Sequence, residues 1–483
     1  MKNLKEILNQ VRIIRFSGRI DREIRFLSFD TRQLGAEDLY VALKGTRSDG
    51  HDYIPVAVNN GATAVVCEKL PGILKENVCY IEVEDSHEAL GVIASAFYGC
   101  PSGKLKLIGI TGTNGKTTIA TLLYRISRSL GYKAGLISTI AVVIEERSRT
   151  ATHTTPDPLQ INQALSEMVD EGCEYAFMEV SSHAAVQKRI SGLIFCGGIF
   201  TNITHDHLDY HKEFKDYLKA KKFFFDNLSA DAFALYNADD KNGKVMVQNT
   251  KAEKYSYGLK AMADFRASVI ESHLEGNLLR IGNHEVWTKL PGAFNACNML
   301  AVYAAAVLSG MHEESVLRAL SEQSSVPGRF DIIKSARGIT GIIDYAHTPD
   351  ALENVLNTIN KIRTGESRLI TIVGAGGNRD KEKRPVMARL AAEMSNKIIL
   401  TSDNPRDEDP DDIISDMKKG IDNTSAHKVV TITDREEAIQ TACAFAENGD
   451  IILLAGKGHE NYQEIKGVRK HFDDKEMLLK YIK

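Results

Sequence analysis

The sequence lacks the long apolar runs and the charge excess that are typical of membrane or nucleic-acid-binding proteins. No apolar run approaches the roughly 20 residues that cross a bilayer. Its 60 basic and 64 acidic residues give a net charge of −4, so we expect no electrostatic footprint for nucleic acid or an anionic membrane. The first residues are acidic and polar where a signal peptide needs an apolar region, and we therefore expect a cytosolic protein.

The sequence also lacks a cysteine pattern typical of disulfides or zinc sites. Its seven cysteines are scattered, odd in number and without a C-x-x-C pair. Most lie in apolar stretches, which favours buried, reduced thiols. With 43% hydrophobic and 26% charged residues over 483 positions, the composition is that of a globular enzyme of about three domains.

What the sequence does have is a glycine-rich stretch between a predicted strand (105–110) and a predicted helix (119–130). In such a loop, backbone N–H groups and the helix N-terminus face phosphate, while Lys116 reaches the distal phosphates and a threonine hydroxyl can bind magnesium. The usual first glycine of the pattern is replaced by Ile110, but the Lys-Thr pair and the preceding strand favour an ATP site over a chance glycine turn. The loop residues are Gly112, Thr113, Asn114, Gly115, Lys116, Thr117 and Thr118.

Alternating strand and helix patterns predict an α/β fold of three domains. Residues 1–103 should form a small α/β domain, and 104–330 a central P-loop-type ATPase domain with a mainly parallel sheet. Residues 331–483 should form a Rossmann-like, doubly wound domain, because several of their strands are apolar throughout. Residues 101–104 are predicted to be a short linker, and 433–436 a capping box in which Thr433 begins a helix.

Polar side chains follow several predicted strands, at the sheet edge where open α/β folds bind ligands. Glu179 ends the strand 175–180, and the segment 202–211 after the next strand holds three histidines and two aspartates. Mg²⁺ takes few protein ligands, so Glu179 and one residue of this segment would suffice, although the segment could also be a polar loop with a helix cap. The lysine-rich helix that follows, on its own pattern, is a solvated face.

Four polar loops in the last domain should gather at one sheet edge and form a second ligand site, facing the ATP domain if the two close. In the first domain, two polar stretches either bind a ligand or are solvated. The loops of the last domain are 344–347, 374–380, 403–406 and 456–460, and the stretches of the first domain are 28–32 and 44–51.

Taken together, these segments resemble the Mur ligase family, the ATP-dependent ligases that extend the stem peptide of the bacterial cell wall. The likeness covers nearly the whole chain and is strongest to members that add the third residue. It implies that the three domains bind, in chain order, a UDP-sugar peptide, ATP and the incoming amino acid. The motifs occur in fixed order as DTR, GTRSDG, GTNGKTT, HTTP, EVSSH, DHLDYH, LPGAFN, DYAHTP, DNPR and GKGHE.

The resemblance implies roles for individual residues. Lys116, Glu179, His207 and Lys221 would be catalytic. Magnesium would be held by Thr117, Glu179, His207 and Lys221, the last as a carbamate that supplies an oxygen ligand. ATP would contact the loop from Gly112 to Thr118 together with Asn295 and Arg329. The UDP-muramoyl peptide would contact Thr31 (often serine in the family), Thr46, Arg47, Ser48, Thr154, Thr155, Ser181, Gln187 and Arg189.

The resemblance also indicates which amino acid is joined. Members that add meso-2,6-diaminopimelate end the D-N-P-R motif in arginine, whereas many lysine-adding members do not. A guanidinium can bind the second carboxylate of diaminopimelate with paired hydrogen bonds, and lysine has no such group for Arg406 to hold. A surface ion pair is the alternative for Arg406. The implied contacts are Arg379, Asp403, Asn404, Pro405, Arg406, Gly456 and Glu460.

The implied reaction uses ATP and Mg²⁺ to activate a carboxylate of UDP-N-acetylmuramoyl-L-alanyl-D-glutamate as an acyl phosphate. The amine of meso-diaminopimelate then attacks, in peptidoglycan precursor synthesis. We expect a cytoplasmic monomer that binds no nucleic acid and inserts in no membrane. The alternatives are a lysine-adding ligase of the same family, a folylpolyglutamate-synthase-like ligase, and a nucleotide-gated binding protein that makes no bond.

Overall fold

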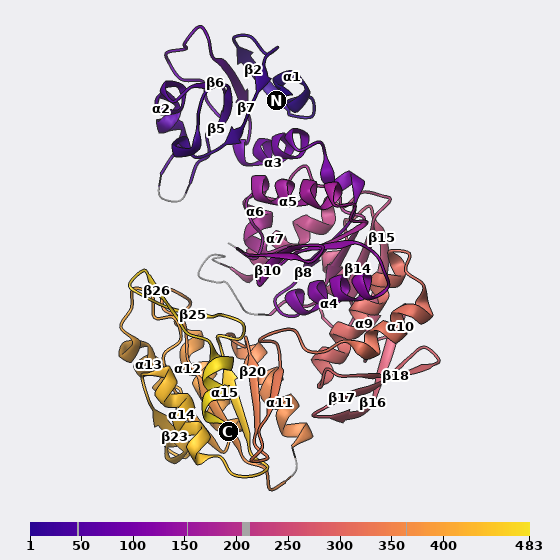
Figure 1. The fold of residues 1–483 in the computed structure, drawn as a ribbon, viewed down its shortest axis with the longest axis vertical. Helices are drawn as coiled ribbons and strands as arrows, with labels where there is room; N and C mark the ends of the chain where they lie inside the picture. The colour runs from indigo at the N-terminus through magenta and orange to yellow at the C-terminus, as the bar shows by residue number, and fades with distance from the viewer. Residues whose placement is uncertain (46–47, 152, 205–212, 364) are drawn as a thin grey trace.

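The computed structural model describes residues 1–45, 48–151, 153–204, 213–363 and 365–483. Strands and helices alternate along these ranges and build three successive α/β parts, with the N-terminal part at the top of Figure 1 and the last part at the bottom. The three main sheets take their strands from residues 13–83, 106–288 and 331–455. The expected three-domain α/β fold is therefore confirmed. Within the described ranges, no helix is both long enough and apolar enough to cross a membrane.

The N-terminal part is a five-stranded sheet with its main helix, α3 (Ser86–Phe97), packed on one face. Helix α3 begins where the Asp85 carboxylate accepts a hydrogen bond from the N–H of Glu88, and its apolar residues pack on the strands. The sheet order is β2 (Ile13–Ser17), β7 (Cys79–Val83), β6 (Ala62–Cys67), β5 (Asp38–Val41) and β4 (Leu27–Ser28). The smaller elements are β1 (Lys2–Asn3), β3 (Glu23–Ile24), α1 (Leu4–Ile7), α2 (Ile54–Asn59) and the 3₁₀ helices η1 (Thr31–Gln33) and η2 (Gly50–Tyr53).

In the described part of the central region, one large sheet is parallel from β9 to β16 and antiparallel at both edges. Strand β8 lies in its middle, between β12 and β13. The edge formed by β16, β17 and β18 was not anticipated from the sequence. The order is β11 (Arg147–Thr150), β10 (Ala141–Ile144), β9 (Ala134–Ile137), β12 (Tyr175–Glu179), β8 (Lys106–Thr111), β13 (Gly197–Phe200), β14 (Phe233–Asn237), β15 (Glu253–Gly258), β16 (Phe265–His273), β17 (Gly276–Ile281) and β18 (His284–Thr288).

Helices cover both faces of this sheet because alternate strand residues point to opposite sides. Ile108 and Ile110 of β8 pack with α4, α9 and α10, whereas Leu107 packs with α5 and α7. Figure 1 shows α5 and α7 above the sheet and α4 and α9 below it. The helices are α4 (Lys116–Ser129), α5 (Pro158–Asp170), α6 (Ser182–Val186), α7 (Phe214–Asp226), α8 (Gly243–Met246), α9 (Ala293–Leu308) and α10 (Glu313–Glu322).

The last part is a doubly wound sheet that is parallel except at β19. Helices α11, α12 and α13 pack on one face, and α14 and α15 on the other. The sheet order is β19 (Asp331–Lys334), β20 (Thr340–Asp344), β24 (Ile451–Ala455), β21 (Leu369–Val373), β22 (Lys397–Leu400) and β23 (Val429–Thr431). The other elements are α11 (Pro349–Ile362), α12 (Lys383–Met394), α13 (Pro410–Lys418), η4 (Ala426–Lys428), α14 (Arg435–Phe445), α15 (Asp474–Tyr481) and the hairpin of β25 (Tyr462–Ile465) and β26 (Val468–His471).

The segment predicted as a linker is the 3₁₀ helix η3 (Pro101–Lys104) between α3 and β8, and its buried Ser102 hydroxyl accepts a hydrogen bond from the N–H of Ile194. One local prediction was wrong. The predicted capping box is shifted by one residue: Asp434, not Thr433, caps α14 by accepting from the N–H of Glu437. The Thr433 hydroxyl donates instead to Asp411, a contact from another helix that local sequence does not reveal. The cysteines are free thiols, as predicted.

Candidate active site

The glycine-rich loop follows the middle strand of the central sheet. Strand β8 ends at Thr111, and α4 begins at Lys116 after Gly115, whose φ is +87°. The N–H of Thr113 donates to the Asn202 carbonyl at 2.8 Å, so the loop is tied to the chain that follows β13. The Lys116 ammonium donates to the carbonyls of Gly112 and Thr113 at 2.9 and 2.8 Å. The loop therefore curls around its own lysine at the N-terminus of α4, as a phosphate cradle does.

Gly112 is required by this geometry, and its substitution gives a first prediction. Its φ is +149°, and an added Cβ would lie 1.8 Å from Oγ1 of Thr201. We expect Gly112→Ala to weaken binding of a fluorescent ATP analogue by roughly tenfold or more, because the cradle must move off Thr201. Gly131→Ala is the matched control: its φ is +88°, but no described atom lies within 4 Å of an added Cβ. Equal affinities for the two variants would contradict this role of Gly112.

A cavity of about 370 Å³ lies between the cradle and the last part of the chain. Its volume lies within the range of small-molecule sites, and Asp344 and His347 of the last part complete its wall. The Asn114 amide donates to Asp350 of α11 at 2.9 Å across this junction. The predicted residues that line the cavity are Thr113, Asn114, Gly115, Lys116, Thr117, Thr118, Thr154, Glu179, Asn295 and Arg329.

Glu179 is a fully buried carboxylate that lines this cavity together with Thr117. Both of its oxygens accept from Thr139, one from the N–H at 2.8 Å and one from the hydroxyl at 3.1 Å. These donors are neutral, so neither of them carries a charge opposite to that of the carboxylate. A buried carboxylate beside a phosphate cradle fits a hard divalent cation such as Mg²⁺. Thr139 was missed by the sequence analysis, since nothing in its local pattern marks it.

Lys221 is buried against the cradle, although the lysines of α7 suggested a solvated face. Only 2% of Lys221 is exposed, whereas 64% of the Lys219 side chain is. Its ammonium donates to the Gly112 carbonyl at 2.7 Å and lies 4.6 Å from the centre of the Tyr217 ring. The structure thus separates Lys221 from the other lysines of the helix. The predicted His207 lies outside the described residues.

Predicted contacts of the muramoyl peptide cluster beside Glu179. The Thr155 hydroxyl donates to the Glu179 carbonyl at 2.8 Å and lies 3.2 Å from the Ser181 hydroxyl. Arg189 donates to the Thr155 carbonyl at 2.6 Å and to the Gln187 side chain at 2.6 and 3.0 Å. Thr154 joins this group through Thr139, with 3.1 Å between the hydroxyls.

The other predicted contacts of this substrate are in the N-terminal part. Thr31 begins η1, and Ser48 is exposed. Neither lines the cavity. Thr46 and Arg47 lie outside the described residues.

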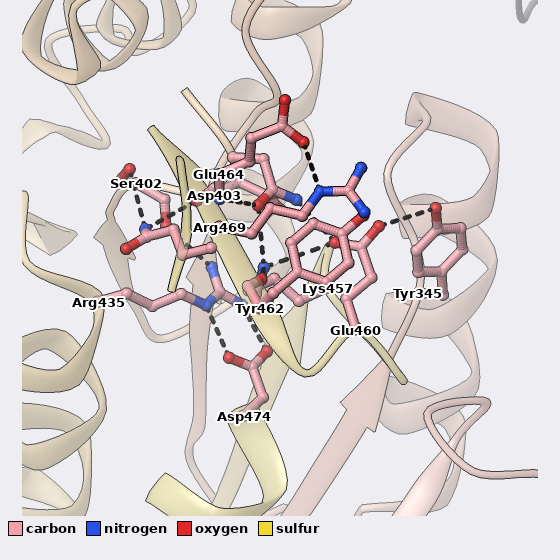
Figure 2. A network of polar contacts seen from close by, with 12 residues as sticks. Tyr345, Ser402, Asp403, Arg435, Lys457, Glu460, Tyr462, Glu464, Arg469 and Asp474 are labelled. Atoms are coloured by element: carbon pink, nitrogen blue, oxygen red, sulfur yellow. Dashed lines mark hydrogen bonds and ion pairs between the residues drawn. The ribbon is translucent and has the colours of Figure 1, made fainter. Parts of the chain in front are cut away.

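The loops of the last part meet around Glu460. The Asn404 amide donates to one Glu460 oxygen at 2.7 Å. The Tyr345 hydroxyl donates to the other at 3.4 Å (Figure 2). The Asp403 carboxylate lies beside Gly456, 2.6 Å from the position of an added Cβ. Pro405 continues the same loop, and its carbonyl approaches Gly377 closely. Four of the predicted contacts, Asp403, Asn404, Gly456 and Glu460, are thus neighbours.

Tyr345 and Arg329 connect this second site to the cradle, which the sequence did not reveal. The Arg329 guanidinium stacks 4.5 Å from the centre of the Tyr345 ring and donates to the Thr117 hydroxyl at 3.1 Å. Asp344 fixes the adjoining backbone by accepting from the N–H of Phe330 at 2.7 Å. Burial raises the pKa of Asp344 to about 6. The two ligand sites predicted separately therefore adjoin in the structure.

Arg379 and Arg406 flank Gly376, so two arginine side chains lie at the same loop. An added Cβ on Gly376 would lie 2.9 Å from Nη1 of Arg406 and 3.7 Å from Cγ of Arg379, which is itself exposed. Arg406 has the unusual φ of +52° and donates to the Gly377 carbonyl at 2.8 Å. Its backbone pairs with β25, accepting from Lys466 at 2.6 Å and donating to Glu464 at 3.0 Å.

An ion pair between the buried Arg384 and the partly exposed Glu408 holds this arginine loop in place. Arg384 is fully buried and donates to both oxygens of Glu408, which also accepts from the N–H of Asn378 at 2.6 Å. The hydrogen bonds from Arg384 lower the pKa of Glu408 from 4.5 to about 2. A lowered carboxyl pKa adds stability above the unfolded value, and this contribution is lost as the pH falls toward 2.

We therefore expect Glu408→Gln to lower the free energy of unfolding by about 2 kcal/mol at pH 7. The difference from wild type should shrink between pH 4.5 and about 2, where the wild-type carboxyl takes up its proton. Chemical denaturation at several pH values measures this difference in the free energy of unfolding. Glu447→Gln is the control, because Glu447 is 79% exposed in its pair with Arg368. A difference that stays constant down to pH 2 would count against the ion pair.

Sequence models of three domains match the chain in order: "Mur ligase family, catalytic domain" at residues 23–98, "Mur ligase middle domain" at 110–306 and "Mur ligase, glutamate ligase domain" at 328–458. A protein of Bacteroides fragilis named UDP-N-acetylmuramoyl-L-alanyl-D-glutamate--2,6-diaminopimelate ligase is 58% identical over 475 residues, 98% of each chain. A solved structure of a ligase with the same name is 31% identical, with a TM-score of 0.70 over 100% of this chain and 98% of that one.

A more distant solved structure shares the fold alone. Mycobacterium tuberculosis folylpolyglutamate synthase, complexed with ADP and AMPPCP, is 16% identical with a TM-score of 0.62. The match covers 92% of that protein but only 76% of this chain. This chain is therefore the longer of the two.

Proposed function

This chain belongs to the Mur ligase family, and we propose that it joins meso-2,6-diaminopimelate to UDP-N-acetylmuramoyl-L-alanyl-D-glutamate by an ATP-dependent amide bond. The observation that carries the proposal is the junction of two sites. Arg329 donates a hydrogen bond to Thr117 of the phosphate cradle and stacks on Tyr345, and Tyr345 donates to Glu460. Glu460 lies among the loops of the last part, one of which ends in Arg406. A ligase must activate one substrate with ATP and present the second to the activated group, and this junction suits both steps.

In the first step, a carboxylate of the D-glutamate residue attacks the γ-phosphorus of ATP, and ADP leaves. Lys116 and the cradle N–H groups bind the phosphates, and the cluster of Thr155 and Arg189 orients the acceptor. Thr117, Glu179, His207 and carbamylated Lys221 would hold Mg²⁺, which supplies charge neutralisation for the phosphates. The carbamate forms when the neutral Lys221 amine adds carbon dioxide and releases a proton. Positioning and charge stabilisation carry most of phosphoryl transfer.

In the second step, an uncharged amine of diaminopimelate attacks the acyl carbon, and phosphate leaves. Asp403 and Glu460 offer carboxylates to the substrate's ammonium, while Arg379 and Arg406 offer guanidiniums to its carboxylates. A site built around the second carboxylate disfavours lysine, because the guanidinium would be left without its partner.

We also propose that each of the three domains binds one of the substrates. Residues 1–103 bind the UDP-sugar peptide through Thr31, Thr46, Arg47 and Ser48, residues 104–330 bind ATP, and residues 331–483 bind the amino acid. The enzyme works as a monomer in the cytoplasm, where its nucleotide substrates are.

An assay of ADP release tests the proposal. We expect ADP only when ATP, the UDP-muramoyl dipeptide and an amino acid are all present, and much faster release with meso-diaminopimelate than with L-lysine. Equal rates would identify a lysine-adding or unselective ligase. Faster ADP release with glutamate and a folate would support the folylpolyglutamate-synthase alternative. Binding of ATP, the dipeptide and the amino acid without release of ADP would support a nucleotide-gated binding protein.

A further inference from the structure

Lys457 is a fully buried lysine beneath the amino-acid loops, and the mechanism above does not use it. Its ammonium donates to the Tyr462 carbonyl at 2.5 Å (Figure 2). It also lies 3.4 Å from Oδ1 of Asn404 and 3.5 Å from Oε2 of Glu460. Burying an ammonium costs several kcal/mol unless acceptors and an opposite charge compensate it. Lys457 has both, which indicates a cation held in place rather than a solvated surface lysine.

The Lys457 ammonium offsets the negative charge of two neighbouring carboxylates, those of Asp403 and Glu460. Asp403 is buried, and the Glu460 side chain is only 16% exposed. Burial raises the pKa of Glu460, the charge of Asp403 raises it further, and Lys457 lowers it. The next cation, Arg435, is already committed to Asp474 in a fully buried pair. The charged or titratable groups facing Glu460 are Asp403, Lys457, Arg435, Tyr345 and Tyr462, with Asp474 behind Arg435.

Lys457 also fixes the orientation of the Asn404 amide. Oδ1 of Asn404 accepts from the Lys457 ammonium and from the N–H of Glu464, the latter at 2.9 Å. With both donors on the oxygen side, the amide nitrogen must point the other way, where it donates to Glu460 at 2.7 Å. The Lys457 ammonium and the Glu464 N–H therefore set the direction of Asn404 together and, through it, that of the Glu460 carboxylate.

We propose that Lys457 is a positioning residue for the amino-acid substrate, and that its buried ammonium keeps Glu460 ionised and oriented to receive the substrate's ammonium group. Lys457 cannot contact that group itself, because the two charges repel, so it acts through Glu460. The inference rests on the proposed function, which takes Glu460 as a contact of the diamino acid.

The test compares KM for meso-diaminopimelate in wild type and Lys457→Met at pH 6.5 and pH 9. Without the cation, Glu460 takes up a proton at higher pH, so binding is weaker at the lower pH. We expect the ratio of variant to wild-type KM to be roughly tenfold at pH 6.5 and clearly smaller at pH 9, with KM for ATP unchanged. Lys470→Met removes an exposed cation from the nearby hairpin of β25 and β26 and should change neither value. A ratio that is the same at both pH values would overturn the proposal.

Thermal melting keeps the proposal testable if Lys457→Met is too unstable to assay. The variant leaves a buried carboxylate without its cation, and Glu460→Gln in the same chain removes that charge. We expect the double variant to melt at a higher temperature than Lys457→Met alone. A melting temperature of the double variant that is equal to or lower than that of Lys457→Met would count against the pairing of Lys457 with Glu460. This readout does not depend on catalysis, and a wild-type enzyme that forms no product would instead refute the proposed function.

Discussion

Lys221→Ala should lose at least about a hundredfold in kcat, the largest effect expected for one substitution outside the cradle. The Lys221 side chain is buried and reaches the Gly112 carbonyl at 2.7 Å. As a carbamate it would place a carboxylate beside the phosphates, and alanine leaves neither the ligand nor a group that fills its space. ADP release at saturating substrates measures the loss. Lys219→Ala on the same helix is the matched control, because that side chain is 64% exposed and should be dispensable.

Short-chain carboxylic acids should partly restore the Lys221→Ala variant. Acetate or propionate can enter the space left by the side chain and supply the missing carboxylate, whereas neutral amides of the same size should not. The recovery should saturate with acid concentration and be absent in wild type. Full activity of the variant without added acid would reject the carbamate.

Arg406→Ala should lower kcat/KM for meso-diaminopimelate by roughly 10- to 100-fold. The lost charge-assisted hydrogen bonds correspond to about 1.5–3 kcal/mol. The backbone of Arg406 has a φ of +52°, a conformation that costs energy for arginine, and hydrogen bonds with Glu464 of β25 and with Lys466 secure it. Steady-state kinetics with varied diaminopimelate measures the effect.

Two comparisons separate substrate binding by Arg406 from a structural role. Arg406→Lys keeps the charge but loses the paired geometry, so it should fall between wild type and alanine. The slow reaction with L-lysine should change little in either variant, since lysine lacks the second carboxylate. Unchanged kinetics with diaminopimelate in Arg406→Ala would refute the assignment.

The cradle and the alternation of strands and helices could be predicted because both are local patterns. The strand before Gly112 and the helix after it need only neighbouring residues to be recognised. Parallel strands then place their C-terminal loops at one edge, which is why the cluster of Asn404 and Glu460 was anticipated from sequence.

The features that could not be predicted from the sequence depend on contacts between distant segments. Lys221 and Lys219 belong to the same run of lysines, and only packing against the cradle shows that one of them is buried. Tyr345 and Lys457 lie in motifs that matched the family, but the contacts of Tyr345 with Glu460 and of Lys457 with Asn404 join segments that are far apart in the sequence. The antiparallel edge from β16 to β18 was not predicted because this segment has no helix between its strands and so lacks the strand–helix alternation.

The proposed diaminopimelate-adding activity is best tested by mass spectrometry of the product formed from equal amounts of L-lysine and meso-diaminopimelate. With ATP and the UDP-muramoyl dipeptide, we expect one new amide product, whose mass is that of the diaminopimelate adduct. Lysine and diaminopimelate adducts in similar amounts would contradict the selectivity assigned to Arg406, and no adduct at all would contradict the ligase itself.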